Sequence, residues 1–148
     1  MTVFNASQGN GKGCIAFVPT DSELIGSITE DSFQLLSFTY HGSIQVIVAY
    51  VSSNANLKAV AESLQSLLES RLNQVIIGDF NFDTKENNPL TRFMTEKNWH
   101  QMVEGPTHEA GRTIDHLYAS TDFMKCIELN VMFKYYTDHA ALQIKFKW

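Results

Sequence analysis

Three short polar motifs at the ends of apolar, strand-like runs constrain the fold more than any other feature of this chain. Gly78–Asn81 (Gly-Asp-Phe-Asn) follows the run Val75–Ile77, Thr113–His116 opens a second run, and Thr137–His139 precedes a third. Each motif places a carboxylate beside an amide or an imidazole where a strand meets a loop. Reacting groups of α/β proteins gather at such sheet edges. We therefore predict an α/β protein with a site at one edge of its sheet.

The bulk properties predict one globular domain over residues 1–148. Hydrophobic residues make up 44% of the 148 residues and charged residues 18%, which is sufficient for a sizeable core. No apolar run approaches the ~18–20 residues of a membrane helix, so we expect no membrane partner. Residues 1–12 are polar and Gly-rich, without the pattern of a signal peptide, and we expect them to be flexible.

The cysteine content indicates the cellular compartment, and the net charge restricts the binding partners. Cys14 and Cys126 lie in apolar runs without metal-type spacing. We interpret them as free buried thiols in a reducing, intracellular compartment (cytoplasm or nucleus), with a disulfide as the alternative. The net charge of −5 argues against binding nucleic acid by bulk electrostatics. It remains compatible with an acidic pocket that a cation neutralises.

Hydrophobic periodicity predicts a two-sheet α/β sandwich with helices outside. A helical pattern covers about residues 56–72, with Asn54 or Asn56 as its cap, and Asn88-Pro89 begins a short second helix. Strand-like runs cover residues 13–18, 24–28, 33–40, 43–51, 75–77, 113–120, 126–133 and 141–146.

Asp79 and Asn81 lie two residues apart, so a continuing strand would point both side chains to the same side. A carboxylate there can accept a proton from water or hold a metal. The neutral amide can bind a phosphate oxygen without adding negative charge. The alternative is an ordinary turn, in which Gly, Asp and Asn are common.

Two acid–imidazole pairs follow. In Asp138-His139, the carboxylate can ligate a hard cation and the imidazole can donate a proton or stabilise a phosphate; the alternative is a capped strand start with a surface histidine. Asp115 lies within an apolar run, where a charge is costly unless it is paired. We predict that Asp115 orients His139 across the sheet, with a buried hydrogen-bond network as the alternative. His116 points to the other face and is interpreted as structural.

Tyr50 and Arg112 are weaker candidates for phosphate contacts. Tyr50 ends a strand, where its hydroxyl could reach a phosphate or the ring could simply be core. Arg112 precedes the second motif, where a solvated loop charge is the alternative. His41, His100 and His108 have no partner pattern and are interpreted as surface or loop residues.

Taken together, these motifs resemble the endonuclease/exonuclease/phosphatase (DNase-I-like) superfamily. Gly78–Asn81 matches its Gly-Asp-x-Asn element, and Ile114–His116 resembles the form found in LINE-type retrotransposon endonucleases. Thr137–His139 resembles its closing Ser-Asp-His. Ala49–Ser52 resembles its Tyr-x-Pro element with Ser in place of Pro. The order and spacing of the motifs agree over residues 13–148.

The resemblance implies a four-layer α/β sandwich and Mg²⁺-dependent attack of water on a phosphodiester of nucleic acid, DNA in preference to RNA, with Mn²⁺ as an alternative ion. Asp79 would activate water and, with Asp138, hold the metal. His139 and Asp115 would stabilise the developing charge. The phosphate would be held by Asn81 and Tyr50.

One departure from the family pattern leaves other functions open. Family members begin with a strand carrying an Asn and a second strand ending in a metal-binding Glu, and nothing before Gly13 matches them. Glu23 and Glu30 do not follow apolar strands. We expect an N-terminally truncated form of the fold, with weak activity unless a second chain completes the site. The alternatives are a catalytically impaired binding module or mobile-element remnant, and a phosphatase acting on a small molecule or a lipid head group.

Overall fold

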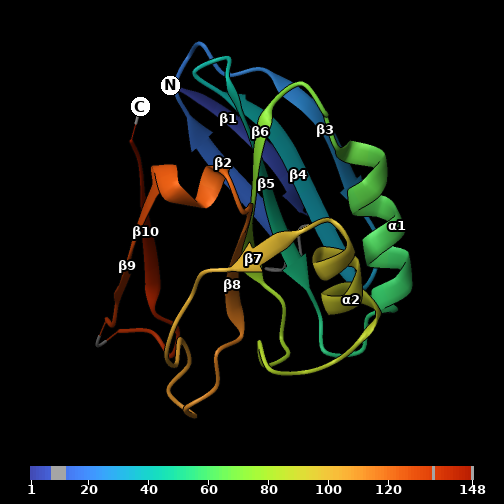
Figure 1. Ribbon diagram of the computed structural model, residues 1–148, viewed down its shortest axis with the longest axis vertical. Coiled ribbons are helices and arrows are strands. Elements are labelled where there is room, and N and C mark those ends of the chain that lie inside the picture. The colour runs from blue at the N-terminus through green and yellow to red at the C-terminus, as the bar shows by residue number, and fades with distance from the viewer. Residues whose placement is uncertain (8–12, 135, 148) are drawn as a thin grey trace.

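The computed structural model describes residues 1–7, 13–134 and 136–147, and its centre is a mixed six-stranded sheet (Figure 1). The strand order is β3-β4-β5-β6-β8-β7, in which β5 and β6 run parallel and the other neighbours antiparallel. These strands are β3 (Leu24–Thr29), β4 (Phe33–Tyr40), β5 (Ile44–Val51), β6 (Asn73–Asp79), β7 (Trp99–Gln101) and β8 (Asp115–Ser120).

Two helices cover one face of this sheet, α1 (Leu57–Leu67) and α2 (Pro89–Glu96). Asn56 caps α1 by accepting the backbone N–H groups of Lys58 and Ala59, and Asn88 forms a capping box at α2. The predicted first helix extended to residue 72, but α1 ends at Leu67. The side chain of Gln45 binds the Leu67 carbonyl at 2.6 Å and fixes the chain as it leaves the helix.

Two hairpins cover the opposite face (Figure 1). One pairs β1 (Thr2–Ser7) with β2 (Gly13–Val18), and the other pairs β9 (Ile127–Met132) with β10 (Ala141–Phe146) after a short 3₁₀ helix, η1 (Phe123–Cys126). This arrangement confirms the predicted α/β sandwich of packed sheets with helices outside.

The structure corrects two predicted segments. Thr2–Ser7 was expected to be flexible, but it forms β1, because alternate residues such as Phe4 and Ala6 face the core beside β2. The remainder of the expected flexible segment, residues 8–12, lies outside the described residues. The strand predicted from Thr113 begins at Asp115, because the backbone N–H of Thr113 is bound by the Asp83 carboxylate.

The two faces of the central sheet are packed differently. On β5, Ile47, Ala49 and Val51 face the helices and are buried. Val46 and Val48 face the hairpins and remain partly exposed. The hairpins therefore cover the sheet less completely at Val46 and Val48, and theirs is the face on which the polar motifs meet.

Candidate active site

The candidate site begins with three side chains in one row across the sheet. Tyr50 on β5 is the register partner of Asp79 on β6, and Asp79 is the register partner of Asp115 on β8. Register partners on neighbouring strands point to the same face. The row therefore places two carboxylates and a tyrosine together on the hairpin face. They lie where the strands meet their loops, as the sequence predicted.

His139 reaches this row from the loop that precedes β10. Its Nδ1 lies 2.9 Å from Asp115 Oδ2, and its Nε2 lies 3.8 Å from Asp79 Oδ2. A carboxylate only accepts hydrogen bonds, so Nδ1 carries a proton and donates it to Asp115. Nε2 then faces the Asp79 carboxylate. This geometry matches the predicted pairing of Asp115 with His139.

Burial and neighbouring charges within the cluster shift the pKa values of Asp79 and His139. Burial raises the pKa of Asp79, the nearby Asp115 carboxylate raises it further, and the Asn81 backbone N–H and His139 oppose both effects. For His139, burial lowers the pKa, but the hydrogen bond and charge of Asp115 and the charges of Asp79 and Asp138 outweigh burial, so the net shift is upward. The cluster thus favours a protonated imidazole beside a carboxylate that is costly to ionise.

Asp138 lies in the same loop as His139 but has a different partner. Its Oδ2 is 3.2 Å from Nε2 of His108, a loop residue for which the sequence showed no partner pattern. The contact forms because the loop containing His108 pairs with the segment around His139 through an isolated β-bridge. A local sequence pattern could not have identified the contact, since 30 residues separate the two partners.

Of the two other predicted phosphate contacts, Asn81 is hydrogen-bonded to the cluster and, among the described residues, Arg112 is not. The backbone N–H of Asn81 donates to Asp79 Oδ1 at 3.0 Å, and its side-chain Nδ2 donates to the Val51 carbonyl at 2.8 Å. The residue has a φ of 53°, so the chain turns here and does not continue as a strand. Arg112 is exposed, and in the part of the chain that the structure describes its guanidinium makes no hydrogen bond to the cluster.

His116 has the structural position that the sequence predicted. It is fully buried, and its ring stacks on Phe80 at 4.8 Å between centroids. Nε2 faces the carbonyl oxygens of Phe82 and Thr113, so it carries the proton, and Nδ1 accepts from the Tyr118 hydroxyl. Burial lowers the pKa of His116, which keeps this ring neutral behind the site.

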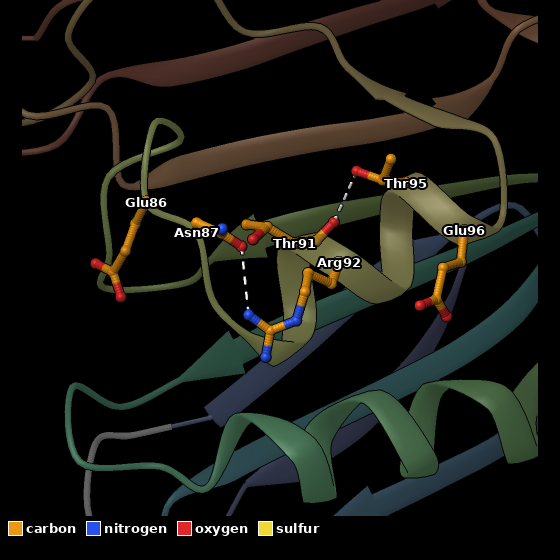
Figure 2. Close-up of a pocket in the computed structure, with 6 residues that line it drawn as sticks. All are labelled: Glu86, Asn87, Thr91, Arg92, Thr95 and Glu96. Atoms are coloured by element: carbon orange, nitrogen blue, oxygen red, sulfur yellow. Dashed lines mark hydrogen bonds between the residues drawn. The ribbon is translucent and has the colours of Figure 1, made fainter.

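A separate surface pocket does not belong to the cluster. Figure 2 shows its lining on and beside α2, where Arg92 donates to the Asn87 side chain. Glu86, Thr91, Thr95 and Glu96 complete this lining. Charges of both signs and short hydroxyl side chains make a solvated helix surface, without the converging carboxylates of the sheet edge.

The residues of the cluster fit a divalent cation. Ligand atoms of Asp79, Asp115 and His139 lie within 4.8 Å of one another, and His108, Asp138 and His139 form a second such group. The repulsion that contributes to the raised pKa of Asp79 is what a bound cation would relieve. Carboxylate oxygens suit both Mg²⁺ and Mn²⁺.

An α/β sandwich with acid–imidazole pairs at one sheet edge defines the structural class of the endonuclease/exonuclease/phosphatase superfamily. A family model described as "Endonuclease-reverse transcriptase" matches residues 44–143. The chain belongs to this family. No curated protein sequence matches it. Within the described residues, no helix has both the length and the apolar character needed to cross a membrane.

Solved structures share the fold at low sequence identity. The endonuclease domain of TRAS1, a telomere-specific non-LTR retrotransposon, is 18% identical with a TM-score of 0.73, covering 99% of this chain and 78% of that one. A 3′–5′ exonuclease from Neisseria meningitidis is 16% identical with a TM-score of 0.62, covering 88% and 72%. The human Nocturnin catalytic domain is 14% identical with a TM-score of 0.58, covering 97% and 71%.

Proposed function

We propose that this chain hydrolyses phosphodiester bonds of nucleic acid, DNA in preference to RNA, with the help of Mg²⁺ or Mn²⁺. The observation that carries the proposal is the cluster of Asp79, Asp115 and His139 at one sheet edge. The match to an endonuclease family and the likeness to the TRAS1 endonuclease domain support nucleic acid as the substrate class. Two free cysteines fit action inside the cell, in the cytoplasm or nucleus.

Each group of the cluster has a chemical role in this proposal. A bound cation would polarise the phosphate and offset its charge, and Asp79 with Asp138 would hold it. Asp79 has a raised pKa, so its carboxylate is suited to accept a proton from the attacking water. His139, oriented by Asp115, would place a positive charge beside the phosphate as negative charge develops.

Three further residues would contact the substrate. Asn81 uses one N–H of its amide on the Val51 carbonyl, which leaves the second for a phosphate oxygen. Tyr50 lies in the same row as Asp79, so its hydroxyl would contact the same phosphate. Arg112 is exposed, and we assign it an outer contact with the nucleic-acid backbone.

The test is nicking of supercoiled plasmid in the presence of Mg²⁺ or Mn²⁺. We expect EDTA, Asp79→Ala and His139→Ala each to abolish nicking. The matched control is His41→Ala, because His41 also pairs with a carboxylate, that of Asp21 at 2.8 Å, but in an exposed turn elsewhere in the sequence. Nicking that survives both site substitutions in folded protein would refute the proposal. A single-stranded RNA and a DNA of the same sequence distinguish the two nucleic acids.

A second candidate is a catalytically impaired binding module, or a domain that needs a second polypeptide. A groove of about 550 Å³ supports it, with Phe17 and Ile144 on its sides and Phe38, Val46 and Val75 at its base. Its sides belong to β2 and β10, which among the described strands pair only with β1 and β9 respectively. An added strand could pair with these edges.

Two measurements distinguish the candidate functions: the binding of a divalent metal and the release of inorganic phosphate. A folded chain whose melting temperature does not rise with Mn²⁺, and which does not nick DNA, would favour the binding module. One structural neighbour, from Neisseria, is a 3′ phosphatase. Release of inorganic phosphate from a 3′-phosphorylated oligonucleotide or an inositol phosphate, without nicking, would instead favour the phosphatase alternative.

A further inference from the structure

We infer that His108 is a positioning residue for the proposed reaction, because it fixes Asp138 and packs against His139. This inference rests on the proposed function, in which Asp138 helps to hold the cation. Its basis is a set of contacts between the loop that contains His108 and the segment Thr137–Ala140, which are far apart in the sequence.

The hydrogen bonds of His108 determine which ring nitrogen carries its proton. The backbone N–H of Ala110 donates to Nδ1 at 3.1 Å, so Nδ1 is an acceptor. In the neutral ring the proton is therefore on Nε2, which lies 3.2 Å from Asp138 Oδ2 and donates to it. Both nitrogens of the ring are occupied, and the ring orientation is fixed.

Burial indicates which partner orients the other. The side chain of His108 is 23% exposed, whereas that of Asp138 is 54% exposed. An exposed carboxylate without a partner samples several rotamers, and each must be given up when it binds a cation. Donation from a more buried ring restricts Asp138 and leaves its other oxygen free to ligate.

Backbone contacts bring His108 and the two functional residues together. The N–H of Glu109 donates to the Asp138 carbonyl at 2.9 Å, and the N–H of Ala140 donates to the Thr107 carbonyl at 2.6 Å. The His108 and His139 rings meet edge to face, with centroids 5.1 Å apart. The contacts of His108 thus reach Asp138 by a hydrogen bond and His139 by ring packing.

The loop of His108 is also tied to the sheet. The hydroxyl oxygen of Thr107 accepts the backbone N–H groups of Ile114 and Asp115 at 3.2 and 3.0 Å. Asp115 is the partner of His139, so the same loop supports both acid–imidazole pairs. A change at His108 should therefore alter how the cation is held without altering the ligands themselves.

The experiment compares two substitutions that differ in one hydrogen bond. His108→Gln keeps an N–H donor at about the position of Nε2, whereas the shorter side chain of His108→Asn does not reach Asp138. We expect His108→Asn to raise the Mn²⁺ concentration for half-maximal nicking about 10- to 100-fold, as for residues that orient metal ligands. His108→Gln should raise it by less than about 10-fold, because it retains the donor to Asp138 whose removal causes the loss.

Two controls separate positioning from general destabilisation. His100→Asn removes an exposed histidine whose ring binds the Thr121 hydroxyl at 2.8 Å, and it should leave the Mn²⁺ dependence unchanged. In an Asp138→Ala background, His108→Asn should have no further effect on the Mn²⁺ dependence. Additive effects in that background, or equal losses in His108→Asn and His108→Gln, would overturn the inference.

Mn²⁺ binding in the absence of DNA keeps this test independent of activity. If the wild-type chain binds Mn²⁺ but does not nick, while His108→Asn weakens that binding, the proposed function fails and the positioning role stands. If wild type nicks and His108→Asn has the same Mn²⁺ affinity, the positioning role fails and the proposed function stands. A wild-type chain that binds no Mn²⁺ contradicts the positioning role as well.

Discussion

Replacing His116 with Phe should destabilise the fold without changing the shape of the core. His116 is fully buried and stacked on Phe80, and Phe keeps a flat ring in that stack. The cavity that usually accompanies a core substitution is therefore small. What is lost is the shared N–H to the carbonyl oxygens of Phe82 and Thr113, and the acceptor for the Tyr118 hydroxyl.

The size of the loss follows from counting those groups. The two carbonyl oxygens share one donor, so the substitution removes two hydrogen-bonding functions. A buried polar group left without a partner costs ~1–3 kcal/mol. We expect the free energy of unfolding to fall by roughly 2–6 kcal/mol at about pH 7.5, and the melting temperature by roughly 5–20 °C for a domain of this size.

The stabilisation that His116 provides should also depend on pH, and the direction of that dependence follows from its pKa. Burial lowers the pKa of His116 below its ordinary value of 6.5, with the Thr113 and Phe82 carbonyls opposing. The unfolded chain therefore binds a proton at this residue more readily than the folded chain does. The stabilisation by neutral His116 is complete above about pH 6.5 and declines as the pH falls below it.

Urea unfolding of wild type and His116→Phe at about pH 7.5 and about pH 5 tests both the size of the loss and its pH dependence. The difference in the free energy of unfolding should be largest at the higher pH and smaller at the lower one. His100→Phe is the control, since His100 is exposed and bound to a surface hydroxyl. A difference below about 1 kcal/mol at pH 7.5, or one that grows on acidification, would contradict a stabilising role for neutral, hydrogen-bonded His116.

Three other perturbations test the site and its surroundings. Gly78→Ala should lower the free energy of unfolding by about 3 kcal/mol or more in urea titrations, because the new Cβ would lie 1.8 Å from a carbonyl oxygen of β5. Asp79→Asn should abolish nicking yet raise the melting temperature by a few degrees, because it removes the repulsion with Asp115 that contributes to the raised pKa of Asp79; a lower melting temperature would contradict this account. A thiol reagent at about pH 8 should modify Cys126 but not Cys14 in the folded chain, since burial raises the pKa of Cys14 to about 12; mass spectrometry of the modified peptides decides the question.

Much of the fold could be predicted because its elements are regular over short stretches. The strand Phe33–Tyr40 and the cap of α2 at Asn88 have the bounds that local patterns predicted. The predicted end of α1 was wrong because a side chain from β5 binds the chain there. The strand Trp99–Gln101 was not predicted at all, because three residues carry too little periodicity to be recognised.

Local sequence patterns predicted which ionisable groups lie at this sheet edge. Asp79, Asp115 and His139 each stand beside an apolar run, and a local pattern is sufficient to place them where strands meet loops. The tertiary structure alone decided which groups meet. His108 contacts Asp138 only because its loop packs against a segment 30 residues away. The physical reason is that periodicity reports which face of an element is buried, whereas partners across a sheet depend on register and loop packing.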